Sequence, residues 1–161
     1  MTQPEDEFFM RMALAQAVLA GQAGEVPVGA VVVRQGEVIA QGFNQPIGLH
    51  DPSAHAEMIA LRSAAKRLGN YRLNDCSLYV TLEPCAMCAG AMFHARIADV
   101  IFGAADPKTG VAGSAMNLFA QTQINHHTRV RGGVLGPECG QLLQEFFSER
   151  RAANRVRTPS P

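Results

Sequence analysis

The chain has 161 residues, of which 47% are hydrophobic and 17% are charged, and its acidic and basic side chains balance to a formal net charge of zero. This composition predicts one folded domain over residues 1–161, and it excludes a disordered chain and a uniformly basic nucleic-acid-coating protein. No apolar run reaches the roughly 18 residues of a membrane span, and the acidic start MTQPEDEFFM lacks a secretory signal, so we expect a cytoplasmic protein without a membrane anchor.

The first half of the chain predicts a helix, a β-hairpin and a second helix. Residues 5–20 carry acids in the first turn and apolar residues at helical spacing. Two β-rich runs flank Gln35-Gly36, which is typical of a hairpin turn. Residues 46–53 predict a loop, and apolar residues then recur at helical spacing over 54–68, so a second helix ends near Gly69.

The second half alternates strands with helices. Residues 77–82 predict a strand, and Pro84 can begin a helix that runs to about residue 95. A strand over 98–102, a long glycine-rich loop and a short strand around Val130 follow. The last helix begins after Pro137 and carries four apolar residues on one face, Leu142, Leu143, Phe146 and Phe147, so periodicity alone places Phe147 in the core.

This order of elements predicts an α/β fold. Its five strands would form a mixed sheet with helices on both faces, which is a three-layer α/β/α sandwich. The C-terminal tail from about residue 155 has no pattern of its own, and we expect it to be disordered.

Potential metal ligands gather in two segments, His55-Ala56-Glu57 and Cys85-Ala86-Met87-Cys88, each at the start of a predicted helix. Cys85 and Cys88 are three residues apart, so they share a helix face in the first turn, where the helix dipole favours thiolates. Two thiolates and one imidazole suit Zn²⁺, and a catalytic zinc has three protein ligands and a position for water. Bound zinc lowers the pKa of water, and Glu57 is the candidate that moves protons.

The residues alone leave alternatives open. A fourth ligand would indicate a structural zinc, and the candidates are Cys76, His50 and His94. A C-x-x-C pair can also be a redox dithiol, but that chemistry needs no upstream His-x-Glu. A capping-box role for Glu57 would place the cap at Ala54, which has no side-chain oxygen. Cys76 and Cys139 are expected to be small buried side chains. No nucleotide-binding glycine motif is present in the sequence, so we expect no nucleotide cofactor.

The run H-A-E followed by L-E-P-C-A-M-C resembles the signature of the cytidine/deoxycytidylate deaminase superfamily, in which H-x-E and P-C-x-x-C mark the zinc site. The segments EVPVGAVVV, GFNQPIG, NYRL, SLYVTLEPCAMCAGAMFHARI and FGAADPKTG narrow the resemblance to the bacterial tRNA-specific adenosine deaminases, over about residues 5–151. The resemblance implies a cytidine-deaminase-like fold, one zinc ion per subunit, a homodimer, and conversion of the wobble adenosine of a tRNA anticodon to inosine with release of ammonia.

The resemblance also implies roles for individual residues. His55, Cys85 and Cys88 would hold Zn²⁺, and Glu57 would carry protons from water to adenine N1 and to the leaving amine. An anticodon loop offers a base that is already single-stranded, which lowers the cost of extruding it. The implied contacts to the base and its neighbours are Val26, Asn44, Ala56, Pro84, Asp106, Lys108, Phe147, Arg150 and Arg151.

Several of these residues also have ordinary structural interpretations. Asn44 and Asp106 are common turn residues, and arginines suit the end of a helix. On the predicted 84–95 helix, the candidate dimer contacts are His94, Met87 and Met92.

Two other functions remain open from the sequence. A small-molecule deaminase of the same fold could act on guanine, cytosine or a nucleoside. A non-catalytic, zinc-stabilised RNA-binding module is the alternative of another class, but it has no use for Glu57. The DPKTG loop and the arginines of the last helix favour RNA.

Overall fold

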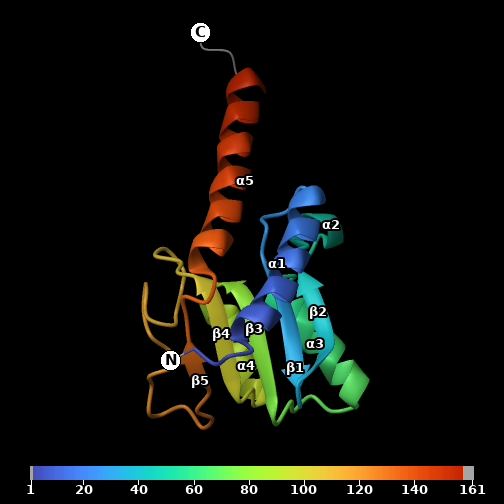
Figure 1. The fold of residues 1–161 in the computed structure, drawn as a ribbon, viewed down its shortest axis with the longest axis vertical. Helices are drawn as coiled ribbons and strands as arrows, with labels where there is room; N and C mark the ends of the chain where they lie inside the picture. Colours follow the sequence, from blue (N-terminus) through green and yellow to red (C-terminus); the bar gives the residue numbers. More distant parts are fainter. Residues whose placement is uncertain (1, 158–161) are drawn as a thin grey trace.

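The computed structural model describes residues 2–157 (Figure 1). The helices are α1 (Asp6–Gln22), α2 (Pro46–Leu49), α3 (Ala56–Leu68), α4 (Ala86–Ala95) and α5 (Gly136–Arg157). The strands are β1 (Gly29–Arg34), β2 (Glu37–Phe43), β3 (Cys76–Leu82), β4 (Asp99–Ala104) and β5 (Arg129–Arg131).

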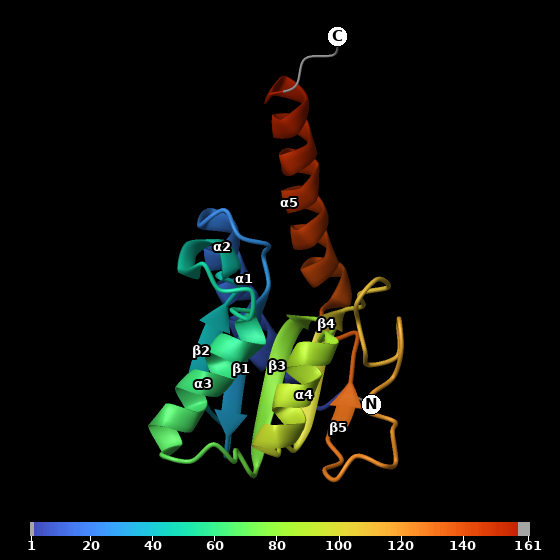
Figure 2. The ribbon, with the colours of Figure 1, turned by 180° about the vertical axis from the view of Figure 1, so that it is seen from behind.

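The five strands form one mixed sheet in the order β2-β1-β3-β4-β5. Strand β1 is antiparallel to both β2 and β3, whereas β3, β4 and β5 run parallel to one another. Helices α3 and α4 cover one face, and α1 with the first turns of α5 covers the other (Figures 1 and 2). The predicted three-layer α/β/α fold is therefore confirmed.

The strands bury both faces because their side chains alternate between two apolar layers. Val32 and Leu78 pack toward α3 and α4, while Val31 and Tyr79 pack toward α1. The hairpin between β1 and β2 turns at Gln35 and Gly36, whose φ angles of 51° and 78° fit a type I′ turn. Cys76 and Cys139 are buried free thiols, as expected.

The parallel pair β3 and β4 determines where the functional loops emerge. Parallel strands end at the same edge of a sheet, so the segments after Leu82 and after Ala104 leave the fold side by side. Helices α3 and α4 begin at this same edge (Figure 2). Residues far apart in the sequence therefore meet there.

Several sequence-based boundaries are wrong. Helices α3 and α4 begin two residues later than predicted, because His55 and Cys85 are extended. The short helix α2 lies within the predicted 46–53 loop. Helix α5 continues to Arg157, so residues 155–157 are helical, while the rest of the predicted disordered tail lies outside the described residues.

Two predictions about side-chain burial are also wrong. Phe147 is 44% exposed, because this part of α5 lies beyond the sheet edge. Met92 is completely buried in the core beneath α4, and it cannot contribute to an intermolecular contact.

Candidate active site

Three metal-competent side chains meet where α3 and α4 begin. His55 and Cys85 are the N-cap residues of these helices, and Cys88 lies one turn into α4. The His55 Nδ1 atom is 3.6 Å from the Sγ of Cys85 and 3.5 Å from the Sγ of Cys88. All three ligand atoms lie within 4.8 Å of one another, so one ion can contact all of them.

The structure rejects the three candidates for a fourth ligand. Cys76 is at the opposite end of β3 from Cys85, His94 is in the last turn of α4, and His50 follows α2. Among residues 2–157, the group that could hold a metal contains only His55, Cys85 and Cys88. Three protein ligands leave one coordination position for water, which is the arrangement of a catalytic zinc.

The electrostatics of the cluster fit a divalent cation. Hydrogen bonds from Cys88 and His55 lower the pKa of Cys85 to about 4, even though burial opposes this change. The Cys85 thiolate and burial in turn raise the pKa of Cys88. Without a cation the site therefore favours one thiolate and resists the second. A bound Zn²⁺ supplies the charge that both thiolates need, so the donor set fits zinc.

Glu57 lies beside this cluster without belonging to it. It is in the first turn of α3, it is 4% exposed, and it lines the same cavity as His55 and Cys85. Burial raises the pKa of the Glu57 carboxyl to about 7. A carboxyl with such a pKa can both accept and release a proton near neutral pH, as a general acid–base group must.

A cavity of about 120 Å³ opens above these groups. Three different loops and two helix starts contribute to its wall, which explains why no single segment of the sequence contains it. Six of the predicted site residues line it together: Val26, Asn44, His55, Glu57, Cys85 and Asp106.

Asn44 and two other predicted contacts have clear partners in the structure. The Asn44 Oδ1 accepts a hydrogen bond of 2.8 Å from the Ala56 N–H. This bond occupies the N–H that the resemblance places opposite the base, and it leaves the Asn44 Nδ2 as the donor available to the cavity. Pro84 is buried between Glu83 and Cys85, and its carbonyl accepts from the Val111 N–H at 2.9 Å.

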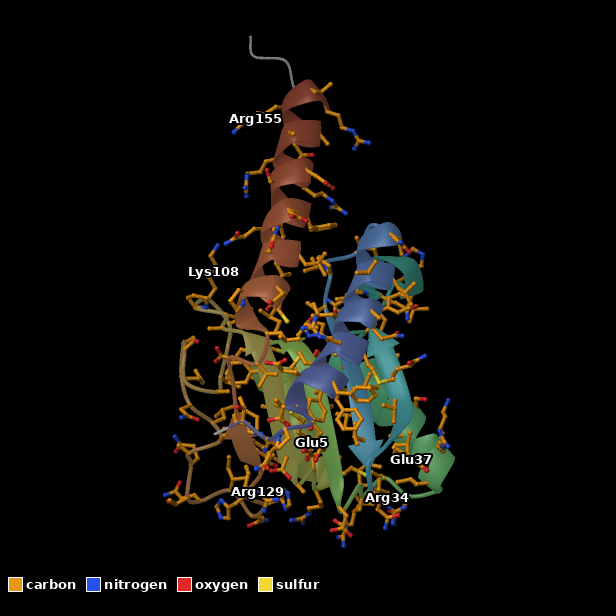
Figure 3. The ribbon with its side chains drawn as sticks, in the orientation of Figure 1. Glu5, Arg34, Glu37, Lys108, Arg129 and Arg155 are labelled. Atoms are coloured by element: carbon orange, nitrogen blue, oxygen red, sulfur yellow. The ribbon has the colours of Figure 1, made fainter. Side chains whose placement is uncertain are left out.

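A groove of about 450 Å³ adjoins the cavity and shares four lining residues with it, Val26, Leu82, Asp106 and Thr109. Lys108 and Phe147 line this groove from opposite sides, one from the β4–β5 connection and the other from α5. Figure 3 shows Lys108 beside the base of α5, with Arg155 on the same side of this helix in that view. The groove therefore offers a cation and an aromatic ring next to the cavity.

Arg150 and Arg151 do not line either hollow. The Arg150 guanidinium donates to the Gly24 carbonyl and lies 5.0 Å from the centre of the Phe146 ring. Arg151 is exposed on the part of α5 that projects from the domain (Figures 1 and 2). The two arginines therefore follow Phe147 on α5 and lie outside the groove that this helix borders.

Sequence reasoning missed four residues that also line the cavity: Val28, Leu82, Glu83 and Thr109. Thr109 gave no signal apart from its place in the DPKTG loop. Glu83 was visible in the L-E-P-C run, but its partners are remote in the sequence.

Comparisons with known proteins agree with this geometry. Residues 3–104 match the family described as cytidine and deoxycytidylate deaminase zinc-binding region. The chain is 50% identical to the tRNA-specific adenosine deaminase of Haemophilus influenzae, over 94% of this chain and 88% of that protein. It is 48% identical to the Bacillus subtilis protein of the same name, over 97% and 96% of the two chains.

Solved structures give the same result. A chain from a study of A-to-I editing by tRNA:A34 deaminases at the wobble position superposes with a TM-score of 0.82 and is 44% identical, covering 84% of this chain and 99% of that one. A guanine deaminase from Bacillus subtilis has a TM-score of 0.61 and is 34% identical, over 94% and 95% of the two chains. The similarity to the tRNA-acting proteins is therefore greater than the similarity to this free-base enzyme.

Proposed function

Because the chain belongs to the cytidine and deoxycytidylate deaminase family and, within it, to the tRNA-specific adenosine deaminases, we propose that it hydrolyses the wobble adenosine of a tRNA anticodon to inosine. The observation that carries this proposal is the buried Glu57 beside a three-ligand metal group, in a cavity that adjoins a groove with a cation and an aromatic ring. The balanced reaction consumes one water molecule and releases one molecule of ammonia.

The residues of the cluster divide the chemistry between them. His55, Cys85 and Cys88 hold Zn²⁺, which when bound activates a water molecule near neutral pH. Glu57 takes a proton from the attacking water and delivers it to N1 of adenine. Glu57 then takes the proton of the hydroxyl group now on C6 and gives it to the amine, so that the C6–N bond breaks, ammonia leaves and C6 keeps a carbonyl oxygen.

The cavity wall orients the base. Val26 offers an apolar contact, and the Asn44 Nδ2 is a donor for a purine ring nitrogen. Ala56 and Pro84 act through their neighbours, since the Ala56 N–H holds Asn44 and the buried Pro84 holds the adjacent loop. Asp106 faces the cavity from the other side.

The groove and α5 hold the rest of the anticodon loop. Lys108 binds a phosphate, and Phe147 stacks on a base that flanks the target. The exposure of Phe147 supports this role, because a ring that is 44% exposed is available to a ligand. Arg150 and Arg151 add positive charge further along α5.

We also propose a homodimer formed through the outer face of α4. Met87 is 38% exposed there, and Phe93 and His94 line a hollow together with the exposed Tyr71. Because the proposed substrate is a tRNA, the cytoplasm is the expected site of action. The described residues include no helix that is long and apolar enough to cross a membrane.

The first test is a substrate panel with the zinc-loaded protein. An anticodon stem-loop with a wobble adenosine is compared with the same loop carrying guanosine, and with free adenosine, guanine, cytosine and cytidine. We expect inosine from the adenosine stem-loop alone. Turnover of a free base or nucleoside with the stem-loop untouched would keep the zinc chemistry and reject RNA as the substrate. Zinc-dependent RNA binding without any deamination would indicate the non-catalytic alternative.

A further inference from the structure

Glu83 is a buried acid that the chemistry described above does not use. It lies between the end of β3 and the ligand Cys85, and only 3% of it is exposed. None of the ion pairs found within residues 2–157 includes this carboxylate. A buried carboxylate without a cation is costly unless hydrogen bonds satisfy it, so its partners indicate what it does.

All of these partners belong to one loop, residues 105–114. The Glu83 Oε1 accepts from the Asp106 N–H at 3.1 Å and from the Ser114 hydroxyl. The Oε2 accepts from the Ala112 N–H at 2.9 Å and from the Ser114 N–H at 3.1 Å. One side chain therefore holds both ends of a loop that has no regular secondary structure.

The loop is closely fitted around this carboxylate. A Cβ atom at Gly110 would lie 2.4 Å from the Glu83 Cδ, so a glycine is needed where the loop passes over the acid. The Asp106 carboxylate accepts from the Lys108 N–H at 3.1 Å and from the Thr109 hydroxyl at 2.8 Å. These bonds close the turn 106–109, whose tip carries Lys108.

This loop forms one wall of the substrate site. Asp106 and Thr109 line the cavity, while Lys108 lies in the adjoining groove. The backbone N–H groups that Glu83 accepts from would otherwise need another acceptor, from the protein or from water. Without the carboxylate, this wall loses four hydrogen bonds to the rest of the fold and keeps the bond from the Val111 N–H to the Pro84 carbonyl.

We propose that Glu83 is a positioning residue for RNA, which holds the 105–114 loop closed so that Lys108 and Asp106 meet the nucleotides beside the target base. This proposal rests on the function proposed above. Glu83 lines the cavity, but it carries no proton in this scheme, and both of its carboxylate oxygens accept hydrogen bonds from the loop. It acts through the loop, so its removal weakens RNA binding while leaving the zinc cluster and Glu57 in place.

The four groups that donate to the Glu83 carboxylate predict which substitutions will affect RNA binding most. Glu83→Gln keeps the size of the side chain but places an amide NH₂ opposite backbone N–H donors, so at least one hydrogen bond is lost and the others no longer end on a charged acceptor; the Ser114 hydroxyl can turn to accept from the amide. Ser114→Ala removes only the hydroxyl donor and keeps the Ser114 N–H bond. We therefore expect a large effect from E83Q and a small effect in the same direction from S114A.

The experiment compares wild type, E83Q and S114A with Asp6→Asn, a control that removes a fully buried carboxylate on the opposite face of the sheet. Zinc content, kcat and KM for the adenosine stem-loop, and amide hydrogen exchange are measured at a temperature where all variants are folded. For E83Q we expect KM to rise about tenfold or more, since each tenfold matches the loss of one strong hydrogen bond. Zinc content and kcat at saturating RNA should stay within a few-fold of wild type.

Hydrogen exchange gives a readout that needs no substrate. Exchange of the amides of Asp106, Ala112 and Ser114 should accelerate in E83Q, whereas α3 and α4 remain protected. D6N should lower stability but change neither KM nor this exchange pattern. If E83Q does not fold, S114A supplies the same comparison on a smaller scale.

The outcomes separate this proposal from the function on which it rests. An inactive wild type would reject the proposed function, and loop exchange would still show whether Glu83 orders the loop. An active wild type with unchanged KM in both E83Q and S114A would overturn the positioning role. Loss of zinc in E83Q would also overturn it, because the carboxylate would then support the metal cluster.

Discussion

Replacing Glu57 by Gln isolates the proton-transfer step. The two side chains have nearly the same volume, and Glu57 is 4% exposed, so the substitution leaves no cavity to collapse. Glu57 is not one of the three metal ligands, so zinc should still bind. An amide cannot carry the proton, and general acid–base catalysis contributes about 10²- to 10⁴-fold to a rate. We therefore expect kcat for the adenosine stem-loop to fall by about 10²- to 10⁴-fold, which is about 3–5.5 kcal/mol of transition-state stabilisation.

Three measurements test this prediction together: single-turnover inosine formation, zinc content and affinity for the stem-loop. Glu37→Gln is the matched control, because Glu37 is an exposed acid of the β1–β2 hairpin, at the edge of the sheet opposite the active site (Figure 3). The control should match wild type in all three measurements. A Glu57→Gln protein that binds zinc and RNA and still turns over within tenfold of wild type would refute the assigned role.

Three further predictions concern the metal, the RNA and the fold. Cys88→Ser should lose most of its zinc in a metal analysis, because a hydroxyl replaces one of three ligands; retention of stoichiometric zinc would contradict the ligand set. Lys108→Ala should weaken stem-loop binding and reduce the slope of log affinity against log salt by about 1; an unchanged slope would show that Lys108 contacts no phosphate. Asp6→Asn should cost about 1–3 kcal/mol in denaturant unfolding at pH 7, because the half-buried Arg131 loses its charge-assisted hydrogen bonds to Asp6 and keeps only the Asp99 carboxylate, 3.4 Å away. Although burial opposes the change, hydrogen bonds from Arg131, Gln3 and Tyr79 lower the pKa of Asp6. The stability that the ionised Asp6 contributes is therefore present above about pH 4 and is lost as the pH falls through its folded-state pKa. The difference in unfolding free energy between wild type and Asp6→Asn should disappear over that range.

The order of elements was predictable because short-range physics determines it. Gln35-Gly36 predicts a hairpin since both residues must adopt positive φ, and the structure shows both in that region. The starts of α3 and α4 were not predictable to the residue. His55 and Cys85 are extended because their side chains face one another across two helix ends, and this contact exists only in the folded chain.

Burial along α4 and α5 shows a different limit. Helical periodicity indicates which residues share a face, but it does not indicate what covers that face. Phe147 continues the apolar face of α5 beyond the sheet edge, where the described chain leaves it 44% exposed. Met92 is buried instead, because the sheet lies directly under its side of α4.

The residues that carry the chemistry of the active site were predictable, but the residue that holds the loop beside it was not. Residue type and spacing identify the metal ligands and the acid–base group, since few other functions combine them: His55, Glu57, Cys85 and Cys88. Glu83 carries no such signal, because its partners are 23 to 31 residues away and are three backbone N–H groups, which every loop possesses, and one serine hydroxyl. A residue that works by accepting from backbone donors can only be found once the loop is folded around it. The L-E-P-C run therefore combines two kinds of residue: Cys85 acts on the metal directly, and Glu83 acts through the loop that the substrate must meet.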